Sequence, residues 1–271
     1  MLSSLSPSIA KVLEEAGGQW GVYVEDLQTG EQLAFNQDER FYAASVIKVP
    51  IMTAVFSEVY AGKFALDTKI ALRSEDQVGG AGILQHMTPG SEWTVQDLVT
   101  LMIIQSDNTA TNILIDLVGR DAIRAAMQAT EMTNSRFYNK LMIVPAQVEG
   151  YNEVTAADLG NHLRYLATGK VISYDSCERM IAILKQQQHR DRIPHHFPYP
   201  GGDVIGSLPS WEFANKTGSV TKITHDMGIL YIGSRAVTIC VLNKGLEQRP
   251  AVQAIAKIGK LVFDLYDDNE K

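Results

Sequence analysis

The sequence predicts a mixed α+β fold, in which an antiparallel sheet flanked by terminal helices carries an inserted all-helical domain. Alternating apolar residues mark strands near both ends of the chain, helical periodicity fills the middle, and a helix is expected close to each terminus. Because strands at the two ends can pair in one sheet, the segment between them is expected as an insertion. We therefore expect residues 1–40 and 204–271 to form the sheet domain and residues 41–203 the helical domain.

The first expected elements are a helix and a β-hairpin. The helix covers about 6–16 and ends at two glycines. Alternating segments at 21–27 and 31–35 flank a short glycine-containing turn, which favours a hairpin. Apolar residues at helical spacing predict a second helix over 43–60, and Pro50 can distort its early part.

Helices fill the middle of the chain and strands return in the last third. The expected elements are helices at 94–105, 109–118, 120–129, 155–167 and 174–187, a connection at 191–203, strands at 211–220, 226–233 and 235–243, and a helix at about 250–266. His225-Asp226 is expected to begin a strand turn. No internal repeat is apparent.

Composition narrows the class of protein. The 271 residues are 45% hydrophobic and 20% charged, which suits a chain of one domain or two closely packed ones. A net charge of −7 argues against nucleic-acid binding, since phosphate binding needs clustered Lys and Arg. No stretch approaches the about 18 apolar residues of a membrane span. We expect a soluble monomer that acts on a small molecule.

The compartment and the cysteines stay open. The N-terminus lacks a basic start followed by an apolar run, so the chain is cytoplasmic as written, or secreted if its numbering begins after processing. Cys177 and Cys240 are compatible with two free thiols or with a bridge. Cys240 lies in the apolar run 237–242, where a buried thiol is expected.

Three short strings carry the chemistry: Ser45-Val-Ile-Lys48, Ser106-Asp-Asn108 and Lys216-Thr-Gly218. The first pattern alone is weak, because it also occurs at Ser8/Lys11 and Ser219/Lys222. All three together in this order have a chance expectation on the order of 1 in 1,000. The set suits acyl transfer through a serine ester.

Ser45 and Lys48 have the geometry of a nucleophile and its base. Residues three apart on a helix share one face, so Lys48 can reach the hydroxyl of Ser45. A lysine serves as base when burial or a neighbouring positive charge lowers its pKa. At the first turn of a helix, Ser45 also lies near N–H groups that favour a developing oxyanion.

The other two strings supply further polar groups. Asp107 and Asn108 suit caps and turns between helices, but beside the Ser45 pair Ser106 becomes a proton relay and Asn108 a donor to a substrate amide. Lys216 begins its string on a predicted strand. It is either a solvated edge lysine beside a glycine bulge or the group that attracts a substrate carboxylate.

Other catalytic classes lack their signatures. The chain has no G-x-S-x-G elbow, no H-E-x-x-H and no nucleotide-binding glycine loop, and His195-His196 is expected in a polar loop. We expect no metal and no cofactor.

The motif set resembles the penicillin-recognising serine enzymes, which are the class A β-lactamases and penicillin-binding proteins. The segments 88–98 and 106–112 are similar to class A enzymes in particular. The resemblance implies that Ser45 is acylated, Lys48 is its base, and Ser106 passes a proton to the β-lactam nitrogen. It assigns the substrate amide to Asn108.

The resemblance also implies a carboxylate subsite and an oxyanion hole. Lys216 and Thr217 would bind the substrate carboxylate, and the backbone N–H groups of Ser45 and Ser219 would bind the oxyanion. The segment that begins Ser234-Arg235 is similar to the strand that carries a carboxylate-binding arginine, so Arg235 is a candidate ligand.

One class A feature is absent. Class A enzymes activate the deacylating water with a glutamate in a Glu-x-x-Leu-Asn loop, and residues 137–154, where that loop should fall, lack the motif. Of the two glutamates there, Glu149 is the better substitute and Glu153 the poorer. Loss of a positioned base slows deacylation about 100- to 10,000-fold, so the acyl-enzyme is expected to accumulate.

Two alternatives to a β-lactamase stay open. One is a penicillin-binding DD-peptidase or esterase, and the other is a non-catalytic β-lactam or peptidoglycan sensor.

Overall fold

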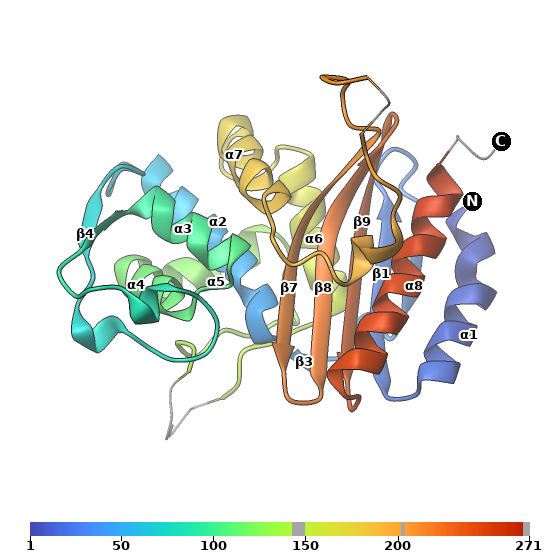
Figure 1. Cartoon of the computed structure of the whole chain (residues 1–271), viewed down its shortest axis with the longest axis horizontal. Coiled ribbons are helices and arrows are strands. Elements are labelled where there is room, and N and C mark those ends of the chain that lie inside the picture. The colour runs from blue at the N-terminus through green and yellow to red at the C-terminus, as the bar shows by residue number, and fades with distance from the viewer. Residues whose placement is uncertain (143–149, 202–203, 268–271) are drawn as a thin grey trace.

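Five antiparallel strands form the central layer of the molecule (Figure 1). The computed structural model describes residues 1–142, 150–201 and 204–267. The strand order is β2-β1-β9-β8-β7, with β1 at Gln19–Asp26, β2 at Gln32–Phe35, β7 at Trp211–Val220, β8 at Ile223–Ile232 and β9 at Arg235–Lys244. The first strand pairs with the last, from Gln19 opposite Lys244 to Asp26 opposite Val237. The predicted sheet built from both ends of the chain is confirmed.

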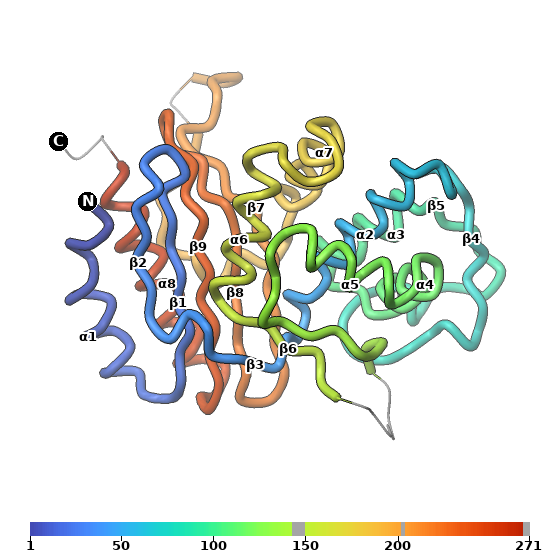
Figure 2. The backbone as a smooth tube through the Cα atoms, turned by 180° about the vertical axis from the view of Figure 1, so that it is seen from behind, coloured from blue at the N-terminus to red at the C-terminus, as the bar shows by residue number. Residues whose placement is uncertain are grey.

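The two terminal helices cover one face of this sheet. Helix α1 spans Ser6–Ala16 and α8 spans Gln248–Tyr266, and they run side by side in both views (Figures 1 and 2). The sheet contributes every second residue to the cluster that they bury, including Val22, Val24 and Ile239. That alternation sets the register of the strands, because a shift of one residue would expose these apolar side chains.

The opposite face meets the helical part of the chain. Its helices are α2 Lys48–Tyr60, α3 Val95–Ile104, α4 Asn108–Val118, α5 Arg120–Ala129, α6 Ala156–Ala167 and α7 Tyr174–Lys185. Helix α6 lies directly on the sheet, as Figure 2 shows from behind. One continuous hydrophobic cluster joins these helices to sheet residues such as Tyr23, Met227 and Cys240. The division of the chain at residues 41 and 203 stays a prediction.

Short elements connect the helices and strands. Two-stranded pairs join β3 Phe41–Tyr42 to β6 Glu153–Val154 and β4 Lys69–Ala71 to β5 Glu92–Thr94. The 3-10 helices are η1 Leu2–Leu5, η2 Ala44–Ile47, η3 Ser74–Asp76, η4 Leu84–His86 and η5 Ile193–His196. The helix expected over 43–60 is thus divided into η2 and α2. Pro50 occupies the first turn of α2, where a missing N–H costs nothing.

The sequence placed His225-Asp226 at a strand turn, and this expectation is wrong. Strand β8 begins at Ile223, and the turn before it contains Lys222 with a φ of 57°. His225 and Asp226 lie inside the strand and are buried. Cys177 and Cys240 are free thiols, and both are buried as Cys240 was expected to be.

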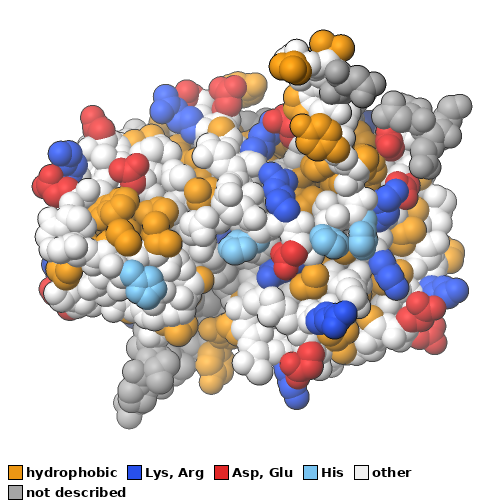
Figure 3. Space-filling model, in the orientation of Figure 1, with side chains coloured by type: hydrophobic (Ala, Val, Ile, Leu, Met, Phe, Trp, Pro, Cys, Tyr) orange, Lys and Arg blue, Asp and Glu red, His pale blue; other side chains and the backbone are white. Residues whose placement is uncertain are grey.

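The surface carries charges of both signs. On the face in Figure 3, Lys and Arg side chains are interspersed with Asp and Glu and do not gather into one basic patch. Within the described residues, no helix combines the length and the apolar composition needed to cross a membrane.

Candidate active site

Ser45 lies on η2, against the edge of the sheet. Its predecessor Ala44 has a φ of 43°, in the left-handed region that a residue with a side chain seldom adopts. The edge strand β7 approaches so closely that a Cβ atom on Gly218 would lie 2.9 Å from the Ser45 backbone N and 3.1 Å from that of Val46. A glycine at position 218 is therefore required for the approach.

Lys48 is fully buried one turn after Ser45. Side chains three residues apart on a 3-10 helix eclipse each other, which directs Lys48 to the same side as Ser45. Its Nζ donates to the Ser106 carbonyl at 2.6 Å, to Ser106 Oγ at 3.2 Å and to Asn108 Oδ1 at 2.8 Å. Burial lowers the pKa of Lys48 to about 7, although the nearby charge of Asp107 opposes this shift.

Ser106 connects Lys48 with Lys216, and we call these three residues together with Ser45 the cluster. It lies between α3 and α4 with a φ of 54°. Its Oγ accepts from Lys48 Nζ at 3.2 Å and from Lys216 Nζ at 3.1 Å. Because a hydroxyl has one proton and two lone pairs, accepting two hydrogen bonds leaves its O–H free to donate.

Asp107 and Asn108 fix the position of Ser106. Asp107 caps α4 by accepting from Ala110 N at 2.9 Å, and its other oxygen accepts from the backbone N of Ile83 and Leu84. Asn108 accepts from Lys48, and its Nδ2 donates to the carbonyl of Gly79 at 3.1 Å. The expected capping role of Asp107 is confirmed.

Lys216, Thr217 and Ser219 lie on the edge strand. Lys216 is fully buried and donates to Ser106 Oγ and, at 2.8 Å, to the carbonyl of Thr217. Burial lowers the pKa of Lys216 well below its ordinary value, and the charges of Lys48 and Arg192 add to this shift. Thr217 is buried, whereas Ser219 is exposed where the strand ends.

Arg192, which the sequence did not single out, also reaches this strand. The segment before η5 crosses the face of β7 and β8 (Figure 1). The Arg192 guanidinium is buried and donates to the carbonyls of Gly218 and His225, at 3.2 and 2.6 Å, and to Ser219 Oγ at 2.8 Å. The expected loop around residues 191–203 gave no sign of this, because the contact depends on the path of the loop over the sheet.

The structure does not bring Arg235 into the cluster, which corrects the expectation that it binds the substrate carboxylate. Arg235 begins β9. Gly218 of β7 pairs with His225 of β8, and His225 pairs with Leu242 of β9, so Leu242 is the β9 residue in line with Gly218. Seven strand positions separate Arg235 from Leu242, which is about 23 Å at 3.3 Å a residue. Its guanidinium instead pairs with the buried Asp26 at 3.1 Å.

The candidate loop base lies outside the described residues. Glu149 falls in the segment 143–149, so its role stays a prediction. Glu153, in β6, pairs through its backbone with Tyr42 and Arg136.

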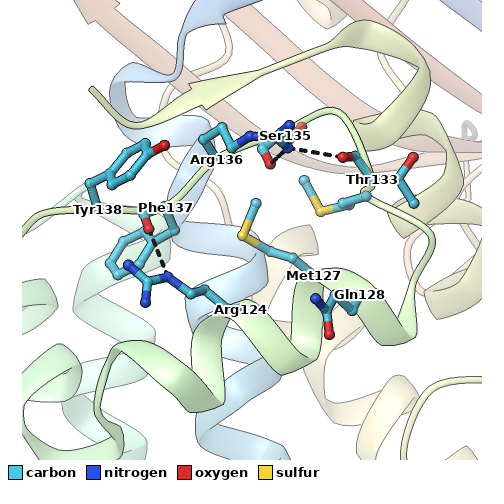
Figure 4. Close-up of a pocket in the computed structure, with 9 residues that line it drawn as sticks. Arg124, Met127, Gln128, Thr133, Ser135, Arg136, Phe137 and Tyr138 are labelled. Carbon is cyan, nitrogen blue, oxygen red and sulfur yellow. Dashed lines mark hydrogen bonds between the residues drawn. The ribbon is translucent and has the colours of Figure 1, made fainter. Parts of the chain in front are cut away.

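A separate hollow of about 330 Å³ lies between α5 and the segment 132–138, and none of the nine residues that line it belongs to the cluster (Figure 4).

Comparisons with known proteins agree with this fold. A model of the beta-lactamase enzyme family matches residues 4–266. Beta-lactamase L2 of Stenotrophomonas maltophilia is 35% identical over 254 residues, which cover 90% of this chain and 80% of that protein. A solved beta-lactamase from Sphaerobacter thermophilus has a TM-score of 0.89 and 34% identity, over 98% of both chains. The solved structure of PBP-A has a TM-score of 0.85 and 25% identity, over 98% of this chain and 97% of that chain.

The match to the family model extends over nearly the whole chain, so it includes both the sheet and the helices that hold the cluster. The chain therefore belongs to the beta-lactamase enzyme family, as a β-lactamase-like serine hydrolase.

Proposed function

We propose that this protein forms an acyl-enzyme on Ser45 with β-lactams. The observation that carries the proposal is the position of Lys48, a buried amine one turn after Ser45. Burial lowers the pKa of this amine to about 7. An amine with such a pKa is largely unprotonated just above neutral pH and can accept the serine proton. An ordinary surface lysine would be protonated there.

Acylation then proceeds by three proton transfers. The Ser45 oxygen attacks the β-lactam carbonyl carbon while its proton passes to Lys48 Nζ. The negative charge on the carbonyl oxygen is stabilised by the backbone N–H groups of Ser45 and Ser219. The carbon–nitrogen bond of the ring breaks, and Ser106, whose hydroxyl proton is free, donates to the leaving nitrogen. Lys48 or Lys216 returns a proton to Ser106.

The substrate carboxylate is assigned to the edge strand. Lys216 and Thr217 belong to that strand. The guanidinium of Arg192 lies at the end of the strand, where it donates to Ser219 Oγ. Besides the neutral base Lys48, two basic side chains, Lys216 and Arg192, lie around the site in a chain whose net charge is −7. A local anion site of this kind favours substrates with a carboxylate. Asn108 is assigned to the substrate amide.

Deacylation is proposed to be slow. The Glu-x-x-Leu-Asn motif is absent from residues 137–154. Without a positioned base for water, the ester on Ser45 is expected to hydrolyse about 100- to 10,000-fold more slowly than in an enzyme that has one. Glu149 is the candidate substitute.

The same absence favours a second candidate function. If the ester persists, the protein acts as a penicillin-binding DD-peptidase or esterase, or as a β-lactam or peptidoglycan sensor. The similarity to PBP-A along the whole chain is compatible with this alternative.

Burst kinetics with a chromogenic cephalosporin test the proposal. We expect a burst of about one equivalent followed by slow product release, with a mass adduct on Ser45. Continued fast release would point to an efficient β-lactamase and overturn the slow step. Release that stops after the burst would favour the sensor.

Two alanine variants provide the control. Ser45→Ala should show neither burst nor adduct. Ser8→Ala removes the serine of another S-x-x-K string, on the exposed side of α1, and should behave as the parent. Equal hydrolysis by Ser45→Ala and the parent protein would overturn the proposed nucleophile.

A further inference from the structure

A buried carboxyl group lies behind the edge strand and has no part in the acylation steps. Asp226 is fully buried on β8, opposite Thr217 of β7. Because paired residues share a face of the sheet, its side chain lies on the same face as those of Asn215 and Thr217. This is also the face that Arg192 crosses to reach Ser219.

Asp226 holds the segment that carries Arg192. Its Oδ2 accepts from the backbone N of Ile193 at 3.1 Å, one residue after Arg192. Its Oδ1 accepts from Asn215 Nδ2 at 3.0 Å, on the strand that carries Lys216. One carboxyl group therefore joins the arginine segment to the edge strand.

The charges around Asp226 need a counter-charge. The close acceptors of Arg192 are two carbonyls and a hydroxyl, and its ion pair with the half-exposed Asp191 is long, at 3.8 Å. The acceptors of Lys216 are a hydroxyl and a carbonyl. Buried cations without an anion are costly. The negative charge of Asp226 raises the pKa of Lys216 and of Arg192 against the effect of burial.

We propose that Asp226 is a positioning residue, whose carboxylate keeps Arg192 in place so that the site selects substrates with a carboxylate. The inference rests on the proposed function. It assigns to Asp226 no contact with the substrate, only an effect through Arg192.

Asp226→Asn removes the charge and can keep both hydrogen bonds. Asn215 Oδ1 is buried without a partner among the described residues. If the Asn215 amide turns over, that oxygen accepts from the new amide N–H₂, and the new amide oxygen still accepts from Ile193 N. The variant thus separates the charge of Asp226 from its hydrogen bonds.

The measurement is the second-order rate constant for acylation of Ser45 at pH 8, with benzylpenicillin and with its methyl ester. We expect the ratio of acid to ester to fall about tenfold or more in Asp226→Asn, because charge-assisted binding of the acid is lost. The ester rate should change less than threefold.

Asp26→Asn is the matched control. Asp26 is also buried on a sheet strand beside an arginine, but its partner Arg235 lies at the far end of the sheet. This variant should lose stability and keep the parent ratio of acid to ester.

Three results would overturn the inference: an unchanged ratio in Asp226→Asn, an equal fall in the acylation rate for both substrates, or the same ratio change in Asp26→Asn.

If Asp226→Asn does not fold, Asn215→Ala replaces it, because this variant removes a hydrogen bond and keeps the charge. Its ratio at pH 8 should stay within threefold of the parent, and a tenfold fall contradicts the role of charge. If the parent protein is acylated by neither compound, the proposed function itself fails, and this inference with it.

Discussion

Lys48 is the residue whose chemistry depends most on where the fold places it. The same side chain on the surface would keep its proton to about pH 10. Complete burial lowers its pKa to about 7 instead, in a position where the amine donates three hydrogen bonds to residues 106 and 108. The residue type is visible in the sequence, but the burial that lowers its pKa, and so suits it to the proposed role of base, is not.

The acylation rate should follow the protonation of Lys48. Because the lowered pKa means that Lys48 is protonated below about pH 7 and neutral above it, the rate should rise about tenfold per pH unit from pH 5 to 6.5 and level off near pH 7.5. The measurement is the acylation rate of Ser45 with the methyl ester of a penicillin, which avoids titration of the carboxylate subsite.

Lys48→Arg is the control for this profile. A guanidinium keeps its proton at these pH values, so we expect acylation at least about 100-fold slower. A rate in the parent protein that is independent of pH between 5 and 7.5 would show that Lys48 is not the base.

Two residues beside Ser45, the proposed nucleophile, hold strained backbone. Ala44 and Ser106 both have a positive φ although neither is glycine, which costs on the order of 1–3 kcal/mol each. Such residues persist where the surrounding structure compensates for them, and here they flank Ser45 and the two lysines.

At the scale of elements, close approaches decide where the site forms. Strand β7 can reach η2 only because position 218 has no Cβ atom. Helix α6 can lie on the sheet for the same reason, since a Cβ atom on Gly160 would lie 2.2 Å from the Tyr23 ring. Both glycines are in regular elements, where glycine is otherwise unfavourable.

Gly160→Ala should destabilise the protein despite its gain in helix propensity. Alanine gains about 1 kcal/mol in a helix, but a clash with a buried ring costs about 1–3 kcal/mol and here is severe. We expect a net loss of about 1–2 kcal/mol in the free energy of unfolding, measured with urea.

The Tyr23→Ala background tests the cause of this loss. Without the ring atoms, Gly160→Ala should cost clearly less than it does in the parent protein. An equal cost in both backgrounds would place the clash elsewhere.

At the scale of the whole molecule, the site forms where the edge of the sheet meets the helices. Ser45 comes from η2, Ser106 from the junction of α3 and α4, Arg192 from the segment before η5, and Lys216 from β7. These residues span more than half of the sequence, so the site exists only in the folded chain. The hydrophobic cluster that joins helices and sheet holds the two sides together.

A buried histidine couples three of these helices and makes stability depend on pH. His162 of α6 lies with Nε2 3.0 Å from Thr53 Oγ1 of α2 and with Nδ1 2.8 Å from Oγ1 of Thr130, just after α5. Burial lowers the pKa of His162 to about 3. The unfolded chain therefore binds a proton below about pH 6.5 that the folded protein does not.

Acid should weaken the parent protein more than His162→Gln. Between pH 6 and 4 this histidine costs the parent about 1.4 kcal/mol of unfolding free energy per pH unit, and the variant lacks that loss. The variant should be less stable at pH 8, and the difference should shrink as the pH falls. Urea unfolding at four pH values gives the two curves, and parallel curves would contradict a buried neutral His162.

Three kinds of feature could be predicted from the sequence alone: the fold class, most helices and strands, and the strings that hold Ser45, Lys48, Ser106 and Lys216. These features depend on local periodicity and on residue type, which a chain displays directly. The helix expected over 94–105 spans Val95–Ile104, and the strand expected over 211–220 has those bounds.

Which arginine lies beside Ser219 at the end of the edge strand depends on the tertiary structure. Arg235 stands in a strand with a suitable sequence, but the antiparallel register places it at the far end of the sheet, paired with Asp26. Arg192 reaches the site from a loop, and Asp226 supports it from inside a strand whose start was expected later in the chain. Register, loop path and burial depend on contacts between distant residues. Local patterns do not encode these contacts, whereas packing of the whole chain fixes them.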